Sequence, residues 1–78
     1  MAMEPIILDC LGLACPMPLV KLNEVISGAE PGARIDVLSD DEGSKVDIPV
    51  WCRMRGHEFL DRIDRPDGGW IFQVQVSG

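Results

Sequence analysis

The chain has 78 residues, of which 46% are hydrophobic and 26% are charged. This balance is typical of a folded globular protein and excludes disorder, collagen-like repeats and coiled coil. The length predicts a single domain over residues 1–78. The formal charge is −6, so we expect no direct binding to nucleic acid and none to anionic membranes.

The lack of a targeting signal and the small number of cysteines predict a location in the cytoplasm. The longest uncharged stretches, residues 10–20 and 68–78, have eleven residues each, about half of what a membrane-spanning helix needs. The first residues contain no basic segment before an apolar one, which predicts that there is no signal peptide. Three cysteines are an odd number and too few for a disulfide framework. We therefore expect a cytoplasmic protein with free thiols.

The first part of the chain predicts a strand and then a helix. A short aliphatic run favours a strand over about residues 5–10. From Pro16 the spacing of apolar residues changes to three and four, which predicts a helix that ends near Gly28. The apolar face of this helix is expected to hold Leu19, Leu22, Val25, Ile26 and Ala29.

A second strand and a second helix are predicted next. Residues 35–38 are aliphatic apart from one aspartate, and a polar, acidic loop follows them. The second helix is expected over residues 47–55, with Asp47 as its cap, Pro49 in its first turn and Gly56 at its end. Its apolar face is expected to hold Val50, Trp51 and Met54, with Trp51 substantially buried.

Two strands joined by a tight turn are expected to complete the chain. Residues 58–64 predict a third strand, whose inward face is either Phe59 with Ile63 or Leu60. Residues 66–69 have the sequence Pro-Asp-Gly-Gly, a strong turn signal. The last strand alternates, so one set of side chains is expected to face the helices: Trp70, Phe72, Val74 and Val76.

The predicted element order is β-α-β-α-β-β. Two βα units favour parallel neighbours, and the final turn favours an antiparallel hairpin. Two amphipathic helices can cover only one face of a four-stranded sheet. The sequence therefore predicts a two-layer α/β (α+β) sandwich, with a mixed sheet and two helices on one face.

The residues that carry chemistry lie between Gly12 and Pro18, where Cys15 precedes Pro16. Proline disfavours helical angles in the residue before it, so Cys15 is expected to cap the helix and Pro16 to be its first residue. The Met17 N–H and the helix dipole would then stabilise a thiolate and lower the pKa of Cys15. Gly12, Pro16, Met17 and Pro18 are the residues expected to support this site.

Two motifs make the sequence resemble the TusA/SirA-like sulfur-carrier family. The first is Leu8-Asp9 followed by Gly12-Leu13-x-Cys15-Pro16-x-Pro18. The second comprises Asp40-Asp41, then Asp47-Ile48-Pro49-x-Trp51-Cys52, then His57-Glu58. The similarity extends over nearly the whole chain. One position departs from the pattern, because Leu11 stands where many members carry an arginine.

The resemblance implies a cytoplasmic sulfurtransferase-type carrier with Cys15 as its catalytic residue. Such a carrier accepts sulfane sulfur from a cysteine desulfurase or a rhodanese-like donor and holds it as a persulfide. It then passes the sulfur to an acceptor protein, in tRNA thiolation or in other sulfur metabolism, and it is not a stand-alone enzyme. The transfer needs no cofactor. The missing arginine would weaken thiolate stabilisation or change the partner.

Other interpretations stay open for the remaining candidate residues. Cys10 and Cys52 are expected to pack in the core, and His57 to be a structural or surface residue. Together with Cys15, these three could instead form a Cys₃His zinc site, although we expect no metal. The acidic segment 36–42 is a solvated rim or a docking patch for a basic partner. The alternative function is a non-catalytic interaction or regulatory module of the same fold.

Overall fold

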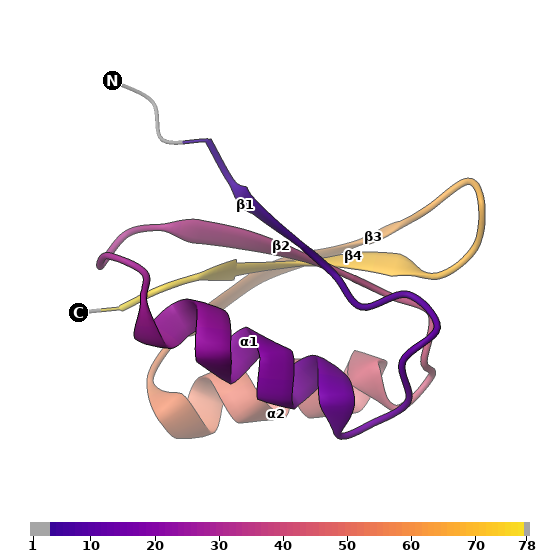
Figure 1. Cartoon of the computed structure of the whole chain (residues 1–78), viewed down its shortest axis with the longest axis horizontal. Coiled ribbons are helices and arrows are strands. Elements are labelled where there is room, and N and C mark those ends of the chain that lie inside the picture. The colour runs from indigo at the N-terminus through magenta and orange to yellow at the C-terminus, as the bar shows by residue number, and fades with distance from the viewer. Residues whose placement is uncertain (1–3, 78) are drawn as a thin grey trace.

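The computed structural model describes residues 4–77 of the chain. Within this range the elements follow the predicted order (Figure 1). They are β1 (Ile6–Asp9), α1 (Met17–Ser27), β2 (Arg34–Ser39), α2 (Ser44–Arg55), β3 (Glu58–Asp64) and β4 (Trp70–Gln75).

The strands form one mixed sheet in the order β1-β2-β4-β3. β1 and β2 are parallel, and β4 is antiparallel to both β2 and β3. Both helices cover the same face of this sheet (Figure 1), which confirms the predicted two-layer α+β fold. Because β1 and β2 are parallel neighbours, the loops that follow them leave the sheet at the same end. α1 and α2 therefore begin close to one another at that end.

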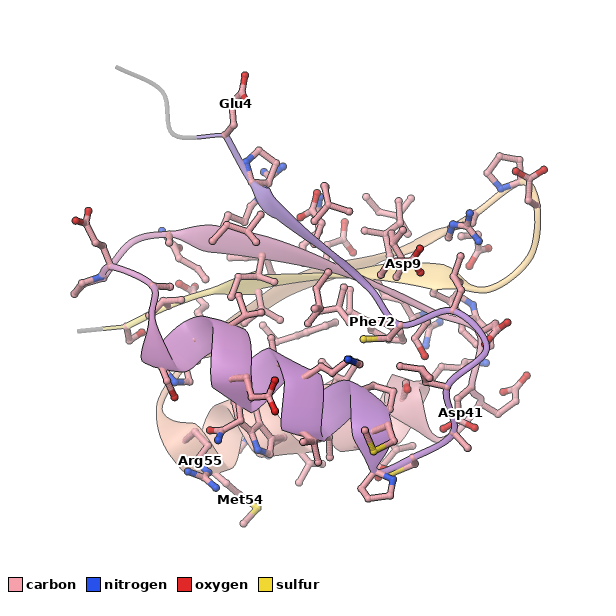
Figure 2. The ribbon with its side chains drawn as sticks, in the orientation of Figure 1. Glu4, Asp9, Asp41, Met54, Arg55 and Phe72 are labelled. Atoms are coloured by element: carbon pink, nitrogen blue, oxygen red, sulfur yellow. The ribbon has the colours of Figure 1, made fainter. Side chains whose placement is uncertain are left out.

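The core lies between the sheet and the helices. Phe72 and Val74 on β4, and Val76 just after its end, are buried, as the sequence predicts, whereas Trp70 is only partly buried. Figure 2 shows Phe72 in the layer between the sheet and the helices. The other buried apolar side chains of the core are Cys10, Leu22, Ala33, Ile35, Val37, Ile48 and Cys52.

α1 follows its predicted pattern. Leu22 is completely buried, and the remaining apolar side chains of the predicted face pack against the core. Pro18, in the first turn, is also fully buried. The helix ends at Ser27 with Gly28 as its cap. Neither α1 nor α2, the helices formed within residues 4–77, is long and apolar enough to cross a membrane.

α2 differs from the prediction in its start and in its buried face. It begins at Ser44 rather than Asp47, so Pro49 lies inside the helix. The side chains turned to the core are Ser44, Ile48 and Cys52, which recur one turn apart. Ser44 can be buried because its hydroxyl pairs with the hydroxyl of Ser39 at 2.9 Å. A polar residue thus occupies a core position that a purely apolar pattern misses.

The apolar stripe predicted for α2 is therefore largely on its outer face. Val50 is 47% exposed and Met54 is 78% exposed. Figure 2 shows Met54 and Arg55 pointing away from the sheet. Trp51 is only partly buried, between the His57 ring at 5.9 Å and the Arg55 guanidinium at 5.6 Å. The prediction that Trp51 is substantially buried is therefore confirmed only in part.

A β-bulge resolves the ambiguity in β3. The register shifts between Phe59 and Asp61, so Leu60 has no partner on β4. Phe59 pairs with Val74, a core residue, and packs against the core. After the bulge, Ile63 pairs with Ile71 and shares its outward face. The extra residue separates two side chains that a regular strand would place on one face.

The buried thiol of Cys52 makes stability depend on pH. Burial raises its pKa from an ordinary value of 9.0 to about 11. In alkali the unfolded chain ionises this thiol first, so unfolding becomes easier as the pH rises through this range. We expect the contribution of Cys52 to be constant below about pH 9 and to decrease by on the order of 2 kcal/mol by about pH 11.

Urea titrations at a series of pH values would measure this loss. Cys52→Ala should be less stable at neutral pH because of the cavity it creates. It should also lose less stability between about pH 9 and about pH 11 than the unmodified protein. An identical alkaline decline in both proteins would contradict the assignment to Cys52.

Candidate functional site

Cys15 lies in the loop that joins β1 to α1. This loop begins with a tight turn, in which Leu13 N–H donates to the Cys10 carbonyl at 3.2 Å. Gly12 has a φ of +80°, in the left-handed region that favours glycine. Leu11 N–H donates to Asp9 Oδ1 at 3.0 Å. Backbone hydrogen bonds thus shape the loop just before the cysteine.

Two aspartates of the β2–α2 loop hold this segment from the other side. Asp40 Oδ1 accepts the Gly12 N–H at 3.0 Å, and Asp41 Oδ2 accepts the Cys15 N–H at 3.3 Å. Asp41 is itself held, because its N–H donates to the buried hydroxyl of Ser39 at 3.3 Å. In Figure 2, Asp41 lies at the end of the molecule where α1 begins. These residues belong to the predicted acidic rim, but here they bind the Cys15 loop.

The Cys15 thiol is exposed and donates a hydrogen bond to Asp47 Oδ2 at 2.8 Å. Asp47 belongs to the first turn of α2, where the helix dipole favours a carboxylate. The hydrogen bond to Asp47 is the largest of the effects that raise the pKa of Cys15, followed by desolvation and by the charges of Asp47 and Asp41. The predicted lowering of this pKa is therefore wrong, because the sequence pattern did not reveal the two carboxylates.

The start of α1 also differs from the prediction. Pro16 is the N-cap, and Cys15 precedes it, joined by a cis peptide bond. Met17 is the first helical residue, and its N–H donates to the Ala14 carbonyl at 3.0 Å. This amide is expected from the sequence to support the sulfur, but in the structure it donates to the backbone instead. Pro18 instead anchors the helix start by its burial.

The other predicted ligand candidates do not gather around Cys15. Cys10 and Cys52 are completely buried, as expected, and burial is the main cause that raises the pKa of each. His57 follows the far end of α2, where it stacks on Trp51 and its Nδ1 accepts the Ser77 N–H at 3.2 Å. Within residues 4–77 no three His, Cys, Asp or Glu side chains are grouped to hold a metal ion. The alternative zinc set is therefore not assembled in this fold.

Sequence reasoning missed Asp40, Asp41 and Asp47 as parts of the site. The sequence predicts Asp47 as a helix cap, and it predicts the other two as part of a solvated rim or of a docking patch for a basic partner. The predicted βα units did contain a usable signal, because parallel neighbouring strands bring the loops at their carboxyl ends together. The side-chain contacts themselves required the folded structure.

Comparisons with known proteins identify the family of the chain and the proteins that share its fold. The family model "Sulfurtransferase TusA" matches residues 6–76. A relative from Archaeoglobus fulgidus is 38% identical over 70 residues, which cover 90% of this chain and 94% of that protein. The sulfur carrier protein TusA of Pseudomonas paraeruginosa is 36% identical over 69 residues, 88% of this chain and 86% of that protein.

A solved structure has the same fold. The crystal structure of the SirA-like protein from Desulfitobacterium hafniense matches with a TM-score of 0.81. The match covers 94% of this chain and 99% of that one, at 20% sequence identity. With a family model that spans nearly the whole chain, the conclusion is direct: the chain belongs to the sulfurtransferase TusA family.

Proposed function

We propose that this protein is a sulfur carrier that receives sulfane sulfur as a persulfide on Cys15 and relays it to an acceptor protein. The observation that carries the proposal is the accessibility of the three thiols. Cys15 is exposed on a loop whose N–H groups donate to the carboxylates of Asp40 and Asp41, whereas Cys10 and Cys52 are completely buried. Only Cys15 can meet the sulfur atom of another protein without unfolding.

The transfer is a thiol–persulfide exchange. The Cys15 thiol loses its proton, and the resulting thiolate attacks the outer sulfur of the donor's persulfide. The sulfur–sulfur bond of the donor breaks, and the donor leaves as a thiolate that takes up a proton. Cys15 then carries the persulfide, and there is no net oxidation. Release follows the same steps, with the acceptor thiolate attacking the outer sulfur on Cys15.

The surroundings of Cys15 suit a protein partner. Met17, two residues after Cys15, is 42% exposed, and Val46 and Val50, one residue before and three residues after Asp47 on α2, are 66% and 47% exposed. Exposed apolar side chains of this kind are common at protein–protein contacts. The donor in this proposal is a cysteine desulfurase or a rhodanese-like protein. The acceptor is a further relay protein, in tRNA thiolation or another sulfur pathway of the cytoplasm, where free thiols persist.

Loading experiments test the proposal. Incubated with a cysteine desulfurase and cysteine, the protein should gain one sulfur atom by intact-protein mass spectrometry and lose it to a reductant. Peptide mapping should place the sulfur on Cys15. If the folded protein gains no sulfur from the desulfurase or from a rhodanese supplied with thiosulfate, the carrier proposal is wrong. The alternative function, a non-catalytic interaction module of the same fold, then remains. A label that appears first on Cys52 would contradict the mechanism.

A further inference from the structure

We infer that Asp47 is a positioning residue of the transfer, whose carboxylate holds the proton on the Cys15 sulfur and keeps the unloaded carrier in a slow-reacting form. This inference rests on the proposed function. It concerns Asp47, which lies 32 positions after Cys15 and belongs to the second motif rather than to the segment around Cys15.

The geometry restrains Cys15 at two points. Its sulfur lies 2.8 Å from Asp47 Oδ2, and its N–H lies 3.3 Å from Asp41 Oδ2. Both acceptors are held by the fold: Asp47 is in the first turn of α2, and Asp41 is bound by its own N–H to Ser39. With the backbone and the side chain both engaged, the thiol is oriented toward a carboxylate rather than left free in solvent.

Within the part of the chain that the structure describes, the charged groups that act on the sulfur are acidic. Asp41 faces it from the β2–α2 loop and Asp47 from α2, and each raises the pKa of Cys15. The first turn of α1, residues 17–20, has no charged side chain, and the charge of Lys21 acts on Cys10 instead. Lys45 pairs with Glu42 at 3.4 Å. Among residues 4–77, a Cys15 thiolate would therefore face two carboxylates without an adjacent cation.

This arrangement has a consequence for each stage of the transfer. Before loading, the proton on Sγ must leave before the thiolate can attack, so the hydrogen bond to Asp47 makes the free protein slow toward unspecific electrophiles. After loading, the inner sulfur has no proton to donate, and only the outer S–H can keep a bond to Asp47. The carboxylate thus distinguishes the unloaded sulfur from the loaded one.

The test is the pH profile of Cys15 alkylation by iodoacetamide, a neutral reagent, mapped by mass spectrometry. Asp47→Asn keeps the size of the side chain and removes its charge. We expect its profile to move to lower pH and its rate at neutral pH to rise at least about threefold. Asp47→Glu keeps the charge and should stay close to the original profile. Asp67→Asn removes the same charge from the exposed β3–β4 turn and should change nothing.

Two results would overturn the inference. An Asp47→Asn profile equal to the original, or moved to higher pH, would show that the carboxylate does not hold the proton. An equal acceleration in Asp67→Asn would assign the effect to net charge alone. Circular dichroism establishes that each variant is folded. If Asp47→Asn does not fold, Asp41→Asn replaces it, with a smaller acceleration expected because Asp41 contacts the Cys15 backbone rather than the sulfur.

Sulfur loading of the same proteins separates this inference from the proposed function. If the unmodified protein takes up no sulfur but its alkylation profile responds to Asp47→Asn, the carrier proposal fails and the role of Asp47 in thiol protonation stands. If the protein loads sulfur on Cys15 and the profile does not respond, the carrier proposal stands and the role of Asp47 is wrong.

Discussion

Replacing Cys15 with serine is expected to abolish sulfur loading and to leave the fold intact. A serine hydroxyl cannot form a persulfide, and the two remaining cysteines are completely buried. Stability should change little, because Cys15 is exposed and a serine hydroxyl can also donate to Asp47. A surface substitution of this kind usually changes the free energy of unfolding by less than about 0.5 kcal/mol.

The loss of sulfur loading is measured by intact-protein mass spectrometry after incubation with a cysteine desulfurase and cysteine. Cys52→Ala is the matched control, since it also removes one thiol and should still gain one sulfur atom. Urea titration of Cys15→Ser establishes that the protein is folded. Normal loading of Cys15→Ser would show that another thiol carries the sulfur.

Phe72→Ala is expected to destabilise the protein by about 3–5 kcal/mol, the range for large aromatic truncations in a core. Phe72 is completely buried on β4, which pairs with both β2 and β3. Its ring lies 6.4 Å from the Phe59 ring and 6.3 Å from the Trp70 ring. Natural domains have a total stability of roughly 5–15 kcal/mol, so a loss of this size removes a large share of the free energy of unfolding.

Denaturant titration followed by circular dichroism measures this effect. Met54→Ala is the control, because its side chain is 78% exposed and the change should be within about 0.5 kcal/mol. If Phe72→Ala is unfolded even without denaturant, Phe72→Leu keeps most of the apolar volume and should cost less than about 1.5 kcal/mol. A loss below about 1 kcal/mol for Phe72→Ala would contradict the placement of Phe72 in the core.

The parts of the fold with a clear period were predictable. Alternation from Phe72 through Val74 to Val76, just after the end of β4, placed these side chains inward, and three- and four-residue spacing identified the face of α1. Such patterns are local consequences of backbone geometry, because side chains alternate on a strand and repeat about every 3.6 residues on a helix. The element order then sufficed to predict the mixed sheet with both helices on one face.

The errors arose where a contact between distant segments overrides the local pattern. On α2, the buried hydrogen bond between Ser39 and Ser44 allows a polar residue into the core and turns Val50 and Met54 outward. On β3, the bulge at Leu60 moves Ile63 to the open face of the sheet. Neither event has a sequence signature that can be separated from ordinary loop and strand residues.

For the candidate site, the sequence by itself determined which residue to consider. The Gly12–Pro18 segment marks an exposed cysteine before a helix, and its motif identifies the family. Only the tertiary structure decided the environment of that cysteine. Asp41 and Asp47 are 26 and 32 positions from Cys15 along the chain, and they reach it because β1 and β2 are parallel neighbours.

The local sequence pattern predicted that the N-terminal end of a helix would lower the pKa of Cys15. The fold raises it instead, because a direct hydrogen bond and nearby carboxylate charge act on the sulfur more strongly than the dipole of a helix whose first amide is already bound.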